Sequence, residues 1–232
     1  RTYTDLLPTN GYLTTKRHLH LDAFEAFVRV LASNEPIVFE RKRQRAMAGP
    51  SSRRQGAGQQ ESSAPGEYKR EYYLEKLGQP PKDAEVLHDL VQSYLEGLSW
   101  CLAYYHDGCA SWDWYYPDFY APLATDLVSL PSFAITLELG APFPPLAQLL
   151  SVLPPQSAQL VPAPYRELML SPTSPVFDAY PKDFSIDLNG KRAEWEAIAL
   201  LPFIDESRLL GATNAIDTSG VLSEAEQARN VL

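Results

Sequence analysis

Histidine and cysteine side chains are the first candidates for metal or nucleophilic chemistry, and all of them except His88 lie in two short stretches of the sequence. His18 and His20 are close together, but no cysteine or carboxylate at ligand spacing completes a metal site around them. Cys101 and Cys109 flank His106 without the paired spacing of zinc sites. These residues therefore do not predict a metal centre.

Carboxylates in the second half of the chain invite a two-metal hydrolytic site. That chemistry needs several carboxylates converging on ions about 4 Å apart. The candidates are Asp178, Asp183, Asp187, Asp205 and Glu206. Because they are scattered through an acidic chain, we interpret them as solvated or helix-capping residues. The sequence also lacks the glycine-rich phosphate loops and the nucleophile-elbow motif.

The aromatic stretch at 111–117 is the strongest candidate for binding chemistry. It reads Ser111-Trp112-Asp113-Trp114-Tyr115-Tyr116-Pro117. Large rings of this kind usually form a hydrophobic core. An exposed ring can instead stack on a nucleic-acid base, which contributes about 1–3 kcal/mol without demanding a sequence. We expect most of the rings to pack internally and one to face a nucleotide, with Trp112, Trp114 and Tyr116 as the candidates.

Helices must position this stretch. Apolar residues at three- and four-residue spacing predict helices over 21–31 and 83–105, and a glycine at 78 closes a further helix that starts at 68. Short helices broken by prolines are expected between 142 and 164, and a loop over 171–190. The predicted fold class is therefore mainly α, an irregular helical domain with few short strands.

The chain divides into three predicted segments: the start of a helical domain (1–41), a flexible basic insertion (42–67) and the main helical domain (68–232). The insertion is rich in Gly, Ser, Gln, Arg and Ala and cannot bury enough apolar surface to offset its ordering entropy. Its 41–54 stretch carries six basic residues and no acid. Taking these six charges from the net −9 leaves −15 for the other residues.

Composition restricts the function classes. With 45% hydrophobic and 11% aromatic residues over 232 positions, the chain can build a real core. Its net charge of −9 disfavours a freestanding nucleic-acid binder, because phosphate affinity depends on Lys and Arg. No run of about 18 apolar residues predicts a membrane span. Two cysteines and no apolar leader favour an intracellular chain.

The termini suggest a fragment of a larger protein. The sequence begins without a methionine. It ends about two turns into a helix whose start is predicted by a capping box at Ser223 and Glu226. We therefore expect a partner region outside these residues.

The ordered motifs resemble the second conserved region of the Xrn family of 5′→3′ exoribonucleases. The resemblance covers nearly everything except 42–67. It rests above all on Gly97-Leu98-Ser99-Trp100, Gly108-Cys109-Ala110 followed by the aromatic stretch 111–117, Tyr120-Ala121-Pro122, Asp187-Leu188-Asn189-Gly190-Lys191 and Leu201-Pro202-Phe203-Ile204-Asp205-Glu206.

The resemblance implies a segment of an enzyme that degrades 5′-monophosphorylated single-stranded RNA in mRNA decay. The family's Mg²⁺ ligands and 5′-phosphate pocket belong to an N-terminal catalytic region that no residue of this chain matches. The helical region walls and gates that active site, and it places a tryptophan near the 5′-terminal bases. Trp112 and Trp114 match this motif. The sequences of these motifs resemble the cytoplasmic branch of the family more than the nuclear one.

Two departures from the family pattern keep an alternative open. Asp118-Phe119 replaces a Tyr-His pair, and Ala141 replaces a basic residue. Both changes remove polar or positive groups beside the presumed RNA path. The alternative is a noncatalytic scaffold, an Xrn-like pseudoenzyme segment that binds a protein partner.

Overall fold

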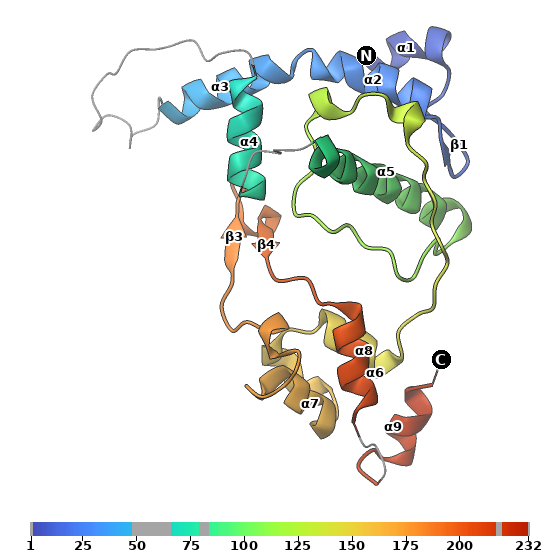
Figure 1. Ribbon diagram of the computed structural model, residues 1–232, viewed down its shortest axis with the longest axis vertical. Coiled ribbons are helices and arrows are strands. Elements are labelled where there is room, and N and C mark those ends of the chain that lie inside the picture. Colours follow the sequence, from blue (N-terminus) through green and yellow to red (C-terminus); the bar gives the residue numbers. More distant parts are fainter. Residues whose placement is uncertain (1, 48–65, 79–83, 217–219, 232) are drawn as a thin grey trace. The chain divides into compact units, whose positions relative to one another are not determined.

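The computed structural model describes residues 2–47, 66–78, 84–216 and 220–231 (Figure 1). The predicted mainly α fold with few short strands is confirmed. The chain forms two compact units, Arg1–Leu139 and Gly140–Leu232. No helix in the described ranges is long and apolar enough to cross a membrane.

The first unit contains helices, one short hairpin and two 3₁₀ turns. Its elements are α1 (Thr2–Asn10), β1 (Thr14–Thr15), β2 (His18–Leu19), α2 (Leu21–Ala32), α3 (Glu35–Met47), α4 (Glu67–Leu77), α5 (Ala84–Asp107), η2 (Ala124–Asp126) and η3 (Leu130–Ser132). Strands β1 and β2 pair antiparallel. The helices predicted over 21–31, 68–78 and 83–105 correspond to α2, α4 and α5, although residue 83 lies outside the described residues.

Helix α5 is the central element of this unit because its apolar face enters two cores. Val91 and Leu95 pack with Val28 of α2 and with Leu127 and Leu130. In the second core, Leu90 packs with Tyr73 of α4 and Leu123. The segment after α5 is thus held against it by apolar burial at several points.

Helices α1 and α3 have no counterpart among the predicted elements. Helix α1 contains Pro8 and ends at Asn10, after which Gly11 adopts a φ of 74°. Helix α3 extends through residues 42–47 of the segment predicted to be flexible, and Glu67 at the other end of that segment begins α4. Residues 48–65 of the predicted insertion lie outside the described residues. Gly78 ends α4 with a φ of 72°, the left-handed conformation that glycine adopts without strain.

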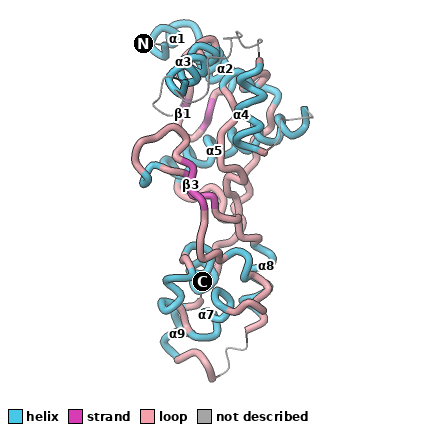
Figure 2. The backbone as a smooth tube through the Cα atoms, turned by 90° about the vertical axis from the view of Figure 1, so that its left-hand side faces the viewer, coloured by secondary structure: helices cyan, strands magenta, loops and turns pink. Residues whose placement is uncertain are grey.

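The second unit is built from short helices joined by loops (Figure 2). Its elements are α6 (Pro145–Val152), η4 (Pro155–Leu160), α7 (Ala163–Leu170), η5 (Phe177–Ala179), β3 (Ser185–Asp187), η6 (Glu194–Glu196), β4 (Ile198–Leu200), α8 (Glu206–Asn214) and α9 (Glu224–Arg229). Leu150, Met169 and Leu209, from three of these helices, are fully buried in one core.

Two local features of the second unit have clear sequence causes. Strands β3 and β4 pair antiparallel, and their connection passes through Asn189 and Gly190 at φ 46° and 78°. The segment predicted as loop over 171–190 therefore contains strand β3. The capping box is confirmed, since Ser223 Oγ accepts from the Glu226 amide while the Glu226 carboxylate accepts from the Ser223 amide.

Candidate functional site

The aromatic stretch folds back along α5 and is tied to it by two indole hydrogen bonds. Trp100 Nε1 of α5 donates to the Ser111 carbonyl oxygen at 2.9 Å. Trp114 Nε1 donates in the other direction, to Glu96 Oε2 of α5 at 3.0 Å. The Ser111 hydroxyl, which is buried, accepts from the Trp114 amide at 3.1 Å. This part of the backbone is therefore fixed by polar contacts as well as by packing.

Trp114 lies with one edge of its ring against α5 at Gly97. Its Cη2 atom would come within 2.9 Å of a Cβ at Gly97. The Trp100 ring stacks on Trp114 at 6.4 Å between centroids and on Tyr104 at 5.2 Å, with interplanar angles of 25° and 8°. The three rings form a continuous stack along one side of α5, which we call the α5 ring stack (Trp100, Tyr104 and Trp114).

Trp112 lies next to this stack in sequence but faces solvent. Its side chain is 52% exposed, and its ring contacts no other ring in the part of the chain that the structure describes. Its backbone is nevertheless held, because the Trp112 amide donates to the Leu139 carbonyl oxygen at 2.8 Å. An exposed indole on a fixed backbone is suited to stacking on a planar ligand.

Tyr116 is half-buried and has a structural hydrogen bond. Its hydroxyl donates to the Tyr120 carbonyl oxygen at 2.8 Å. Burial, and then the nearby charge of Asp118, raise the pKa of Tyr116 well above its usual range. Burial also raises the pKa of the Asp118 carboxyl. The position where the family resemblance expects a polar pair is thus occupied by a partly desolvated acid.

Helix α4 supports the segment after the aromatic stretch. The buried Tyr73 hydroxyl donates to Asp126 Oδ2 at 2.7 Å and accepts from the Leu123 amide at 3.1 Å. Lys69 Nζ lies 2.6 Å from the other oxygen of Asp126. Two turns further along α4 from Lys69, Lys76 Nζ lies 4.7 Å from the centre of the Tyr120 ring, a cation–π contact. These contacts join α4 to the loop in which the aromatic stretch ends.

Several other residues considered as candidates from the sequence make contacts within the protein. The rings of His18 and His20 meet edge to face at 5.1 Å, and His20 Nε2 lies 2.8 Å from the Thr15 hydroxyl. Asp205 caps α8 by accepting from the Arg208 amide, and Asp178 forms an ion pair with the Arg208 guanidinium at 2.6 Å. Within the described ranges, no three His, Cys, Asp or Glu side chains are grouped so that they could hold a metal ion.

Comparison with known proteins decides the family. Residues 63–232 match the family model described as the Xrn1 helical domain. The chain belongs to this family. It is 49% identical over 165 residues to 5′-3′ exoribonuclease 2 of Saccharomyces cerevisiae and 50% identical over 164 residues to that of Candida glabrata. It is 46% identical over 164 residues to human 5′-3′ exoribonuclease 1.

These matches cover about 70% of the chain but only a small part of each relative. The matched stretch is 16% of the length of each of the two yeast relatives and 10% of the human one. The Xrn1 helical domain is thus one segment of much longer proteins in this family. The resemblance to the Xrn family that the motifs indicated is confirmed. Exoribonucleases 1 and 2 match the chain about equally well, so the branch of the family is not settled.

Sequence reasoning missed the α5 residues that hold the site. Glu96 and Trp100 are four residues apart, as are Trp100 and Tyr104, and this spacing places all three on one face of a helix. Gly97, in the middle of a long helix, was a signal of close approach by another group. Two of the three predicted stacking residues differ in exposure: Trp112 is exposed, whereas Trp114 packs on α5.

Proposed function

We propose that this chain is the helical segment of a 5′→3′ exoribonuclease that degrades single-stranded, 5′-monophosphorylated RNA in mRNA decay. The observation that carries this proposal is the family match over 63–232 together with relatives that are all named 5′-3′ exoribonucleases. In this proposal the helical segment walls and gates an active site whose catalytic groups lie elsewhere in the longer polypeptide.

Trp112 is the residue that we assign to RNA. Its exposed indole offers a planar face to a 5′-terminal base, and such stacking contributes about 1–3 kcal/mol regardless of base identity. The Leu139 carbonyl and the Ser111–Trp114 hydrogen bond hold the backbone on either side of it. Trp114 and Tyr116, the other two candidates, are assigned to positioning because their polar atoms already bond within the protein.

The hydrolytic chemistry is assigned to a divalent ion, Mg²⁺, held by carboxylates of a catalytic region outside this chain. A bound metal ion would supply an activated water for in-line attack on the phosphodiester. The residues of this chain contribute a stacking ring and a rigid wall. A chain of net charge −9 has little attraction of its own for phosphate, so RNA affinity must come mainly from the other region.

We place the parent enzyme in the cytoplasm, with the nucleus as the second candidate. Cytoplasmic placement rests on the motif sequences alone, because exoribonucleases 1 and 2 are about equally similar to the chain and do not distinguish the two compartments. Fluorescence microscopy of the tagged full-length protein tests it. Nuclear accumulation would reverse the assignment. The noncatalytic scaffold is not favoured, because the three relatives reported above are named exoribonucleases.

The proposed function is tested with two proteins and two RNAs. The full-length parent and the 232-residue chain are each incubated with Mg²⁺ and a single-stranded RNA carrying either a 5′-monophosphate or a 5′-triphosphate. We expect the parent to degrade only the monophosphorylated RNA, from its 5′ end, and the chain alone to degrade neither. A folded parent without nuclease activity would refute the proposal, and an active isolated chain would refute the assignment of catalysis to another region.

A further inference from the structure

Residues 133–139 form an extended segment with the side-chain alternation of a β-strand. Phe133, Ile135 and Leu137 are half-buried, whereas Ala134, Thr136 and Glu138 between them are exposed. Alternation with a period of two is the pattern of a strand with one covered face. The structure nevertheless pairs this segment with no strand of the described chain.

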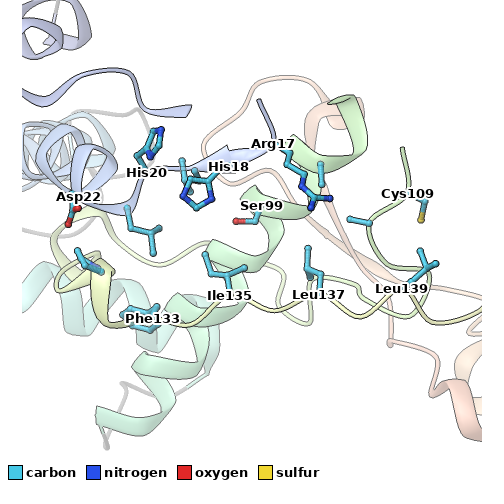
Figure 3. Close-up of a pocket in the computed structure, with 15 residues that line it drawn as sticks. Arg17, His18, His20, Asp22, Ser99, Cys109, Phe133, Ile135, Leu137 and Leu139 are labelled. Atoms are coloured by element: carbon cyan, nitrogen blue, oxygen red, sulfur yellow. The ribbon is translucent and has the colours of Figure 1, made fainter. Parts of the chain in front are cut away.

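The covered face of this segment borders a groove in the first unit (Figure 3). The groove has a volume of about 780 Å³ and lies between the 133–139 segment, α5 and the β1–β2 hairpin. Phe133, Ile135, Leu137 and Leu139 follow one another along one wall, and Arg17 and His18 project from the hairpin on the other (Figure 3). A groove of this size, with apolar side chains along one wall, has room for several further side chains.

The backbone of the segment has an open edge. The Ala134 and Leu139 carbonyl oxygens accept from Gln92 Nε2 and from the Trp112 amide, both at 2.8 Å. The amide groups of residues 134–139 donate to no acceptor in the part of the chain that the structure describes. A row of unpaired amides along an extended segment is a template for another strand.

The groove carries opposite charges at its two ends. Asp22 lies toward Phe133, and Arg17 lies toward Leu137 and Leu139 (Figure 3). Arg17 makes a 3.3 Å ion pair with Asp107, but both side chains are more than half exposed, so this pair is weak and exchangeable. An occupant of complementary charge would therefore have a preferred direction along the groove.

We propose that a β-strand from another part of the longer polypeptide pairs with the open edge at 134–139. Strand addition of this kind uses main-chain hydrogen bonds for affinity and alternate side chains for specificity. The added strand projects alternate apolar side chains into the groove, with an acidic residue near Arg17 and a basic residue near Asp22. The inference rests on the proposed function, in which this chain is part of a protein several times its length; the matched stretch is 16% of the S. cerevisiae relative.

Amide hydrogen exchange at single-residue resolution tests this inference by comparing the 232-residue chain with the full-length parent. In the chain alone, the amides of 134–139 should exchange rapidly. In the parent, every second amide of the segment should exchange about 100-fold more slowly, because a strand's amides point alternately to its two sides. Equal rates in both proteins would overturn the proposal, as would protection that appears only with added RNA or that rises with protein concentration, which would indicate RNA or a second copy as the occupant.

A matched pair of variants in the parent separates the groove from the outer face. Leu137→Glu places a charge among the groove side chains and should abolish the protection of the neighbouring amides, whereas Thr136→Glu, on the exposed side, should preserve it. Loss of protection in both variants, or in neither, contradicts the proposal. The wild-type comparison stands even if Leu137→Glu does not fold. RNA decay measured on the same wild-type samples distinguishes failure of this inference from failure of the proposed function.

Discussion

The Trp114 ring occupies the space that a side chain at Gly97 would need. Its Cη2 atom lies 2.9 Å from the position of a Cβ on Gly97, closer than real side chains approach one another. Trp114 cannot easily move away, because Glu96 accepts its indole N–H at 3.0 Å and Trp100 stacks on its ring. The aromatic stretch is therefore set against α5 at a distance that only glycine permits.

Gly97→Ala should destabilise the chain by about 1 kcal/mol. Overpacking costs about 1–3 kcal/mol, and the better helix propensity of alanine offsets about 1 kcal/mol of it. Gly211→Ala in α8 is the matched control, since nothing lies within 4 Å of its Cβ position and it should stabilise by about 1 kcal/mol. Urea denaturation followed by circular dichroism measures both changes. Equal effects of the two substitutions would show that Trp114 does not restrict Gly97.

Trp114→Ala should cost about 3 kcal/mol of unfolding free energy, because it removes a packed ring and leaves Glu96 without its indole donor. Trp112→Ala, which removes an exposed ring, should change the unfolding free energy by less than about 1 kcal/mol. Thermal unfolding of the two variants makes the comparison. A reversed order would mean that the two rings have been assigned the wrong roles.

Tyr73→Phe should destabilise by about 1–3 kcal/mol, because it leaves the buried Leu123 amide without an acceptor and Asp126 Oδ2 without its tyrosine donor. Tyr72→Phe removes a hydroxyl that donates to the Ala121 carbonyl oxygen at a more exposed position, so it should cost about 0.5–1 kcal/mol. Chemical denaturation of both variants provides the measurement. If the two hydroxyls proved equivalent, the support of α4 for this loop would not depend on Tyr73.

Asp118→Asn should stabilise the chain at pH 7 and have little effect near pH 3. Burial raises the pKa of the folded Asp118 carboxyl above its unfolded value, so the folded state binds the proton more tightly. Stability associated with this group is present at low pH and is lost as pH rises through the raised pKa. Melting temperatures of the variant and the wild type at several pH values check this, with exposed Asp183→Asn as the control. A pH-independent difference would contradict the desolvation of Asp118.

The long apolar pattern of α5, the glycine that ends α4 and the Ser223–Glu226 capping box were readable from the sequence, because each depends on local spacing. Helix α3 was not readable, because its charged 41–45 stretch has no apolar period. Its position depends instead on distant contacts, in which Glu35 accepts from the Thr125 hydroxyl at 2.7 Å and Phe39 packs on Tyr68 and Tyr72. Asn189-Gly190 was a usable hairpin signal that the loop prediction over 171–190 passed over.

The candidate site was readable in composition but not in orientation. The adjacent aromatic residues predicted an aromatic cluster. The sequence did not show which of Trp112 and Trp114 would be exposed, because that depends on which α5 residues each ring meets. The Gly97 gap and the Glu96 acceptor draw Trp114 onto the helix, and the Leu139 carbonyl holds the backbone at Trp112. This distinction arises from tertiary contacts.

The most direct test of the account is the rate at which the full-length parent with Trp112→Ala degrades 5′-monophosphorylated single-stranded RNA. Loss of one stacked base, about 1.4 kcal/mol, should slow decay about tenfold while the melting temperature stays near that of the wild type. Tyr12→Ala, which removes a still more exposed ring outside the aromatic stretch, should leave the rate unchanged. A folded Trp112→Ala enzyme that degrades RNA at the wild-type rate would contradict the assignment of Trp112 to RNA.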